Sequence, residues 1–240
     1  MTTSYAVILA AGVGNRLKPL TNTVPKCLVE VNGKTIMGNA LQALSANGVE
    51  HVYVVVGHLS SLVRETIGPR SNDMTIEFIE NDIFKSTNSM YSLYLGLKDM
   101  QQATWVIEGD VFFEAQILGL PVSKHISWLV DPTRKDLDGT YLRSNRQGRA
   151  ISLEIIRDLS LLQANHHKSI GILRLSPEGV DDLRNWLHQG VENGQTNVHC
   201  DLIMAEHLMD TFVGLVDVSG SKWFEIDTLK DLEEARKLFE

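Results

Sequence analysis

Two glycines and two basic residues near the N-terminus form the most distinctive chemical pattern of this 240-residue chain. Gly12 and Gly14 follow an apolar run, and Arg16 and Lys26 come soon after them. Glycines in such a loop let backbone N–H groups approach a ligand closely, because no Cβ stands in the way. Arg16 offers phosphate a bidentate fork and Lys26 a point charge. The pattern therefore predicts a loop that holds a nucleoside triphosphate.

The loop differs from the two most familiar glycine-rich nucleotide motifs. A dinucleotide fingerprint requires a third glycine, and Leu17 stands at that position. A Walker loop ends in Gly-Lys-Ser/Thr, which is absent here. The nucleotide-binding residues that we expect in this loop are Leu9, Ala10, Ala11, Gly12, Gly14 and Asn15.

Carboxylates follow two apolar segments that lie far apart in the sequence. Asp110 comes after Glu108-Gly109, and Asp227 comes after Glu225. Nucleotidyl transfer places negative charge on the α-phosphate and on the leaving pyrophosphate. A hard divalent cation held by one or two carboxylates normally neutralises that charge.

The elements that must position these residues alternate between strand and helix in the first half. Short apolar runs predict strands at residues 5–9, 51–56, 75–80 and 104–107, and helical spacing of apolar residues predicts helices between them. This alternation favours a mainly parallel sheet with helices on both faces. Ligands of such sheets bind beyond the carboxyl ends of the strands, where the glycine loop, Gly57 and Asp110 would meet.

The second half of the chain is less regular. Strands are expected at residues 125–130, 140–143, 151–155, 169–175 and 212–218. Ser176-Pro177 and Thr228 have the residue types that begin helices. Because no linker or repeat separates the halves, we expect one domain over residues 1–240. Its nucleotide-binding half would span residues 1–114 and its acceptor-binding half residues 115–240.

Composition limits the class of protein. The chain is 43% hydrophobic and 22% charged, which is typical of a soluble globular protein. The sequence predicts neither membrane insertion nor a signal peptide, so the cytoplasm is the expected compartment. The net charge of −8 argues against nucleic-acid binding. Cys27 and Cys200 match no metal or disulfide spacing, and packed thiols are expected. The oligomeric state stays unknown from the sequence.

The segment Leu9-Ala-Ala-Gly-Val-Gly-Asn-Arg-Leu17, followed by Pro25-Lys26, resembles the signature of nucleotidyltransferases, which include sugar-nucleotide pyrophosphorylases and cytidylyltransferases. The resemblance implies an α/β fold of the nucleotide-diphospho-sugar transferase type. That fold is a Rossmann-like three-layer sandwich with a mainly parallel mixed sheet. The resemblance also implies catalytic roles for Lys26 and Arg16. It assigns a Mg²⁺ ion to Asp110 and Asp227, with Glu225 as a helper.

Residues 81–93, which include Asn88 and Ser89, resemble one branch of that family, the phosphocholine and 2-aminoethylphosphonate cytidylyltransferases. Residues 29–34 and 55–59 resemble the same branch. The resemblance implies that Gly57, Asn88 and Ser89 surround the pyrimidine base. The same Ser/Asn cluster is also typical of a helix N-cap, and the two roles are compatible.

The acceptor site is the part of the protein that the sequence predicts least well. A phosphocholine site would surround the quaternary ammonium with aromatic rings and a carboxylate. Trp128, Asp131 and Glu225 are the candidate acceptor residues, and Tyr141 is the other aromatic residue in the neighbouring strands. Trp186 falls on the apolar face of a helix and is expected in the core. The acceptor therefore stays open between phosphocholine, a phosphonate and another small phosphate.

The predicted function is Mg²⁺-dependent transfer of CMP from CTP to a small phosphate or phosphonate, with release of pyrophosphate. One alternative is a sugar-1-phosphate nucleotidyltransferase that uses UTP or dTTP. Another is a non-catalytic nucleotide-sensing regulatory subunit, which should have lost Lys26 or the metal carboxylates. A dinucleotide-dependent oxidoreductase is disfavoured by Leu17 at the third glycine position.

Overall fold

The computed structural model describes residues 3–122 and 125–240. Its strands are β1 (Tyr5–Ala10), β2 (Glu30–Val31), β3 (Lys34–Thr35), β4 (His51–Val56), β5 (Arg70–Ser71), β6 (Met74–Glu80), β7 (Thr104–Glu108), β8 (Val111–Phe113), β9 (Ile126–Asp131), β10 (Gly139–Ser144), β11 (Ala150–Ile156), β12 (His167–Leu175), β13 (Val213–Asp217) and β14 (Trp223–Glu225). Its α-helices are α1 (Ile36–Ala46), α2 (Ser60–Ile67), α3 (Ser89–Leu97), α4 (Pro177–Glu192), α5 (Cys200–Glu206) and α6 (Leu229–Leu238). The strands expected in both halves are therefore present, with ends shifted by one or two residues.

A parallel core lies at the centre of the main sheet. β1 pairs in parallel with β4 on one side and with β7 on the other, and β4 pairs in parallel with β6. Ala6, Val7 and Ile8 of β1 are all fully buried, as expected for a strand covered on both faces. Ala6 and Ile8 belong to the core on the side of α1, and Val7 packs with residues of α3 and α4. Alternate side chains of one strand thus fill two apolar layers.

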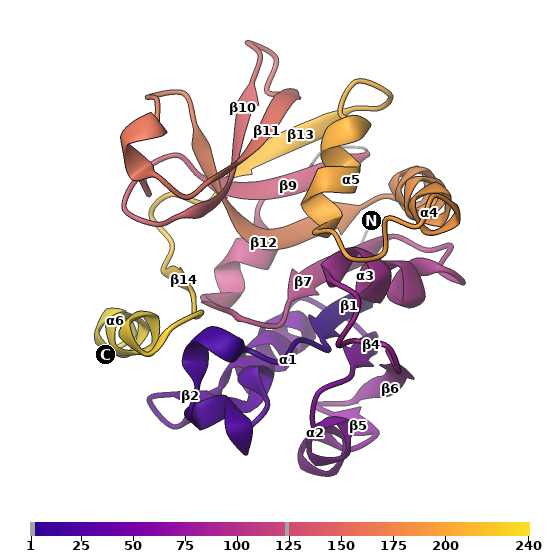
Figure 1. Cartoon of the computed structure of the whole chain (residues 1–240), viewed down its shortest axis with the longest axis vertical. Coiled ribbons are helices and arrows are strands. Elements are labelled where there is room, and N and C mark those ends of the chain that lie inside the picture. Colours follow the sequence, from indigo (N-terminus) through magenta and orange to yellow (C-terminus); the bar gives the residue numbers. More distant parts are fainter. Residues whose placement is uncertain (1–2, 123–124) are drawn as a thin grey trace.

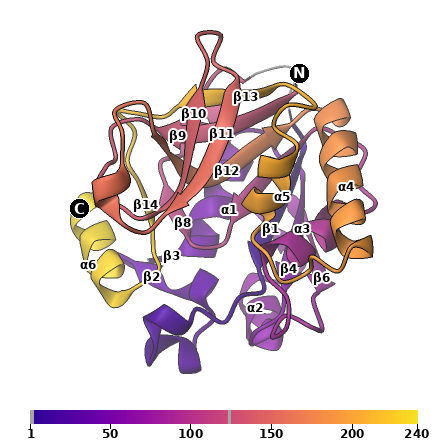
Figure 2. The same cartoon turned by 45° about the horizontal axis from the view of Figure 1, so that its top comes forward.

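Antiparallel strands extend this sheet into the second half of the chain (Figure 1). β12 pairs antiparallel with β7, β10 and β9, and β10 pairs antiparallel with β11. β13 runs parallel to β9. The result is a mixed sheet of ten strands with flanking helices, which confirms the predicted fold class. Figure 2 shows α4 and α5 beside α3 on one flank of the molecule, with α6 on the opposite flank.

Local capping explains where two of the expected helices begin. The Ser176 side chain accepts a hydrogen bond from the Gly179 backbone, and Pro177 occupies the first turn of α4. Thr228 and Asp231 form a reciprocal capping box at the start of α6. Both starts were predicted from residue type. Among the described residues, no helix has the length and apolar character needed to cross a membrane.

Candidate active site

The glycine loop leaves the end of β1 and turns back toward Lys26. Gly14 has a φ of 67°, a left-handed conformation that favours glycine. The Thr21 hydroxyl donates a 2.8 Å hydrogen bond to the Gly14 carbonyl oxygen. A Cβ on Gly14 would lie 3.1 Å from the Cβ of Lys26. A glycine at this position therefore lets the loop pack directly against the lysine.

Lys26 lies between the two aspartates that the sequence singles out. Its Nζ is 2.6 Å from Asp110 Oδ2 and 2.6 Å from Asp227 Oδ1. Arg16 holds the second oxygen of Asp227 at 2.7 Å. Burial opposes the charged form of Lys26, but the two carboxylates outweigh it and raise its pKa above the ordinary value. Burial would raise the pKa of Asp227, but the charges of Lys26 and Arg16 outweigh it and hold this pKa below its ordinary value.

Strand pairing explains how Asp110 and Asp227 meet although they are far apart in the sequence. Asp110 lies in the turn between β7 and β8, and Asp227 follows β14. β14 pairs antiparallel with β8, which places Glu225 opposite Val111. The Ile226 backbone N–H then donates a 2.9 Å hydrogen bond to the Asp110 carbonyl oxygen. The small β8–β14 sheet therefore delivers both carboxylates to the carboxyl ends of β1 and β7.

These groups line a cavity of about 410 Å³ at that edge of the sheet. The predicted nucleotide and phosphate residues that line it are Leu9, Ala10, Ala11, Gly12, Gly14, Asn15, Arg16, Lys26, Asn88 and Ser89. The predicted acidic residues that line it are Asp110, Glu225 and Asp227. Residues of β10, β11, β12 and α5 also line it. The cavity thus lies between the two halves of the chain.

Known proteins are similar to this chain in sequence and in fold. The model of the MobA-like NTP transferase domain matches residues 6–118. Choline-phosphate cytidylyltransferase of Streptococcus pneumoniae is 34% identical over 248 residues, which cover 97% of each chain. This chain belongs to the nucleotidyltransferase family.

Two further relatives of this nucleotidyltransferase carry phosphonate names. 2-Aminoethylphosphonate cytidylyltransferase of Lancefieldella rimae is 24% identical over 241 residues, which cover 95% of this chain and 89% of the relative. CMP-5'-(3-aminopropyl)phosphonate synthase of Streptomyces rubellomurinus is 35% identical over 145 residues, or 60% of this chain. The match spans 23% of that longer protein.

Solved structures agree on the fold. The structure of CTP:phosphocholine cytidylyltransferase from Streptococcus pneumoniae superimposes with a TM-score of 0.80 at 21% identity. The match covers 99% of this chain and all of that one. This match shows the fold, and the sequence relatives place the nucleotidyltransferase in the cytidylyltransferase branch that the sequence resembles.

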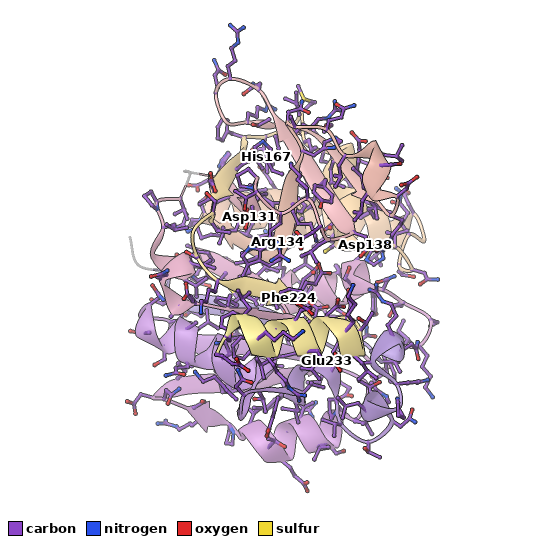
Figure 3. All side chains as sticks on the ribbon, turned by 90° about the vertical axis from the view of Figure 1, so that its left-hand side faces the viewer. Asp131, Arg134, Asp138, His167, Phe224 and Glu233 are labelled. Atoms are coloured by element: carbon purple, nitrogen blue, oxygen red, sulfur yellow. The ribbon has the colours of Figure 1, made fainter. Side chains whose placement is uncertain are left out.

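Two of the acceptor residues predicted for this nucleotidyltransferase need correction. Trp128 is 1% exposed, lies in the core beside α4 and α5, and donates a 2.8 Å hydrogen bond from its indole N–H to Ser169 Oγ. Asp131 is also buried, and its Oδ2 accepts a hydrogen bond from the Trp223 indole. Neither residue lines the cavity. Figure 3 shows Asp131 beside Arg134, above Phe224, on the flank that carries α6.

Gly57 also lies outside the cavity lining. A Cβ at this position would lie 2.8 Å from the Cβ of Phe84 and 3.0 Å from the Ala11 carbonyl oxygen. Gly57 therefore makes room for Phe84, which itself lines the cavity. The expected contact between Gly57 and the base stays a prediction.

The structure adds polar residues that the sequence did not single out. Lys168 is 2% exposed and forms a 2.8 Å ion pair with Glu225. Glu108, Thr140 and Asp201 also face the cavity. No local signal marked Lys168, because it lies one residue before the predicted strand at 169–175 and follows two histidines.

The acidic side chains of the cavity suit a hard metal ion. Glu108, Asp110 and Glu225 each offer an oxygen atom, and these atoms lie within 4.8 Å of one another. Asp110 Oδ1 is buried and has no hydrogen-bond partner in the described structure. Burial raises the pKa of Glu108 well above its ordinary value, and the charges of Asp110 and Asp201 add to the rise. Such crowding of carboxylates is the environment that a divalent cation stabilises.

Proposed function

We propose that this nucleotidyltransferase transfers CMP from CTP to a small phosphate or phosphonate. The observation that carries the proposal is Lys26, a buried cation held by Asp110 and Asp227 where the glycine loop meets the second half of the chain. The full-length relatives named for phosphocholine and 2-aminoethylphosphonate support the choice of CTP and of a small acceptor.

The reaction is an in-line displacement at phosphorus. An oxyanion of the acceptor attacks the α-phosphorus of CTP, a new P–O bond forms, and the bond to the bridging oxygen of pyrophosphate breaks. Pyrophosphate leaves with the bonding electrons. The acceptor oxygen is already ionised at neutral pH, so positioning and charge neutralisation supply most of the catalysis.

We assign the phosphate contacts to two basic residues and the loop. Arg16 and the backbone of the glycine loop bind the β- and γ-phosphates, and Lys26 stabilises charge on the α-phosphate. Arg16 is half exposed, so it can leave Asp227 for the triphosphate without repacking the core. Lys26 is 14% exposed in its side chain, and its attachment to two aspartates fixes its position before the nucleotide binds.

The metal in this proposal is Mg²⁺, held by Asp110 and Asp227 with Glu225 as a helper. The buried Oδ1 of Asp110 is a free ligand atom for it, and Glu108 lies close enough to assist. When bound, Mg²⁺ would supply positive charge for the α-phosphate and for the leaving pyrophosphate.

The remaining assignments concern the base and the two halves. Asn88 caps α3 and the Ser89 hydroxyl accepts a hydrogen bond from the Cys200 backbone, so both line the cavity in fixed positions. We propose that they bind the cytosine, within a nucleotide half at residues 1–114 and beside an acceptor half at residues 115–240. A cytoplasmic location and the lack of a nucleic-acid partner stay predictions.

Pyrophosphate release tests the proposal. The purified chain is incubated with Mg²⁺ and with one nucleotide, which is ATP, GTP, CTP, UTP or dTTP. The acceptor is, in turn, phosphocholine, 2-aminoethylphosphonate, glycerol phosphate, inositol phosphate or glucose 1-phosphate. We expect release with CTP and a small acceptor, and none from the Lys26→Ala variant. Release only from UTP or dTTP with the sugar phosphate would favour the sugar-1-phosphate alternative. Nucleotide binding with no release in any combination would favour a regulatory protein.

A further inference from the structure

The cavity holds more carboxylates than its own cations neutralise. Lys26 pairs with Asp110 and Asp227, and Arg16 adds a second contact to Asp227. Lys168 pairs with Glu225 at 2.8 Å. These contacts account for three of the acidic side chains in the cavity.

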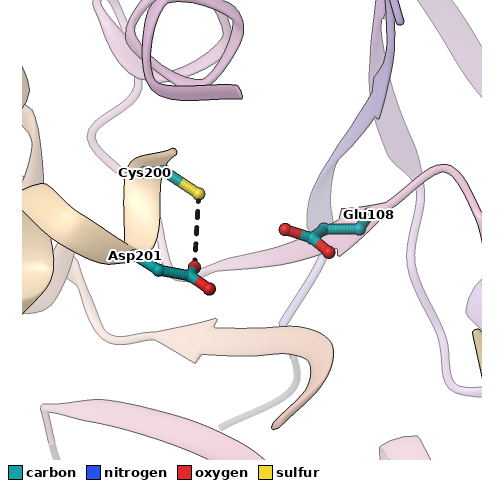
Figure 4. A group of neighbouring side chains, drawn as sticks. All are labelled: Glu108, Cys200 and Asp201. Carbon is teal, nitrogen blue, oxygen red and sulfur yellow. Dashed lines mark hydrogen bonds between the residues drawn. The ribbon is translucent and has the colours of Figure 1, made fainter. Parts of the chain in front are cut away.

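Glu108 and Asp201 are the two carboxylates left over (Figure 4). Neither forms an ion pair within the described part of the chain, and the Glu108 side chain has no hydrogen bond there either. Asp201 receives hydrogen bonds from the Thr140 hydroxyl at 2.5 Å and from the Cys200 thiol at 3.6 Å, which are both neutral donors. One oxygen of each carboxylate lies within 4.8 Å of the other and of the Cys200 sulfur. A cation placed between them would satisfy both.

The neighbouring strand leaves room beside Glu108. β12 changes its register against β9 between Ser169 and Leu173, and Gly171 within this irregular stretch has a φ of 71°. A Cβ on Gly171 would lie 2.9 Å from Glu108 Oε2. The irregular pairing of β12 and the missing side chain of Gly171 together leave the Glu108 carboxylate uncovered at the cavity wall. Such irregular stretches are common in strands next to functional sites.

The lining also limits which cation fits. Phe84 is the only phenylalanine, tyrosine or tryptophan among the described residues that line the cavity. It packs over Gly57 and the Ala11 carbonyl, at the end where the glycine loop lies. A quaternary ammonium donates no hydrogen bond and is usually held by several aromatic faces. A primary ammonium has three N–H donors and reaches two carboxylates at about 2.8 Å each.

Lys168 supplies the opposite charge nearby. Its ammonium group is buried and uses two of its three N–H donors, on Glu225 and on the Ser169 carbonyl oxygen. The third donor has no partner among the described residues and can bond to an anionic group in the cavity. A ligand that carries an anion and an amine a few bonds apart would match both Lys168 and the Glu108–Asp201 pair.

We propose that Glu108 and Asp201 bind a primary ammonium group of the acceptor, so that this enzyme selects aminoalkyl phosphonates or phosphates over quaternary ammonium acceptors. The inference rests on the proposed function and specifies its acceptor.

Three acceptors that differ in one group test the selection. 2-Aminoethylphosphonate carries the amine, ethylphosphonate lacks it, and phosphocholine replaces it with a trimethylammonium. With CTP and Mg²⁺, we expect kcat/KM to be highest for 2-aminoethylphosphonate, by about tenfold or more over each of the others. Equal or better use of phosphocholine or of ethylphosphonate would overturn the inference.

Variants then locate the effect. Glu108→Gln and Asp201→Asn should each lower kcat/KM for 2-aminoethylphosphonate by about ten- to a hundredfold, since each loses a charged hydrogen bond. Asp201→Asn, which lies outside the Glu108–Asp110–Glu225 group, should leave ethylphosphonate turnover, the KM for CTP and the Mg²⁺ dependence nearly unchanged. Glu154→Gln on the exposed side of β11 is the matched control, and thermal unfolding checks that each variant folds.

Two results would contradict the assignment in different ways. Equal losses of Asp201→Asn with ethylphosphonate and 2-aminoethylphosphonate, together with a higher Mg²⁺ requirement, would show that this carboxylate serves the metal and not the acceptor. No consumption of CTP with any acceptor would overturn the proposed function, and this inference with it.

Discussion

The Nζ atom of Lys26 lies 2.6 Å from Oδ2 of Asp110, although the two residues are 84 positions apart in the sequence. The same nitrogen lies 2.6 Å from Asp227, which is 201 positions away. A lysine so held cannot move freely, and both carboxylates are partly neutralised before any ligand binds. The ion pairs of Lys26 therefore connect the phosphate-binding loop to the predicted metal ligands.

Replacing Lys26 should impair turnover far more than nucleotide binding. In Lys26→Ala, charge that develops on the α-phosphate loses its fixed counter-charge, and we expect kcat to fall by about a hundred- to a thousandfold. Arg16 and the loop backbone still hold the outer phosphates, so the Kd for CTP should change much less. Pyrophosphate release and calorimetric titration of CTP measure the two effects. Near-normal turnover would refute the role of this lysine.

Asp110 should be required for metal-dependent activity. Asp110→Asn keeps the size of the side chain but removes its charge and one of its two carboxylate oxygens, the ligand atoms that a hard cation prefers. We expect turnover to fall by at least about a hundredfold, as it does when a fixed charged group is lost from an active site. Activity is measured over a range of Mg²⁺ concentrations. Asp181→Asn on the surface of α4 is the matched control. An unchanged Mg²⁺ dependence would remove Asp110 from the metal site.

Two glycines of the site should respond differently to the same substitution. A Cβ on Gly109 would meet the Leu9 carbonyl oxygen at 2.4 Å, so Gly109→Ala forces β1 and β7 apart. We expect a loss of about 1–3 kcal/mol in the free energy of unfolding. Gly12 has no atom within 4 Å of its Cβ position, so Gly12→Ala should leave stability within about 0.5 kcal/mol.

The same Cβ of Gly12→Ala would project into the space that we assign to the phosphates, so the KM for CTP should rise although the fold is intact. Urea unfolding and the KM for CTP separate the two effects. Equal stability of the two variants would contradict the close approach at Gly109. An unchanged KM in Gly12→Ala would contradict phosphate binding at that part of the loop.

The parts of this molecule that the sequence predicts are those fixed by local pattern. The apolar run that became β1 needs burial on both faces wherever it lies, and the glycines and cations after it are neighbours in the chain. The helix starts at Ser176 and Thr228 depend on side chains that bond to backbone three residues away. Such features can be predicted because the residues that determine them lie within a few positions of one another.

The acceptor end was not predictable because its contacts are set by distant pairing. Trp128 belongs to an apolar strand, and the pairing of β9 with β12 and β13 sets which neighbours its side chain meets in the core. Lys168 follows two histidines, a pattern typical of solvent-exposed chain, yet Glu225 pairs with it from 57 positions away. Which of two alternating strand faces meets a cavity depends on a register that no local pattern specifies.

Burial of Cys27 should make stability fall in alkaline solution. Burial in the core raises the pKa of this thiol from 9.0 to about 12. Between these values the unfolded chain loses a proton that the folded chain keeps. The contribution of the Cys27 thiol to the free energy of unfolding is therefore complete below pH 9 and declines as the pH rises toward 12. In urea unfolding at pH 8 and pH 10, Cys27→Ala should start less stable because it loses packing. It should also lose about 1 kcal/mol less between the two pH values, since the titrating thiol is gone. Equal losses in the two proteins would mean that Cys27 titrates alike in both states, which contradicts its burial.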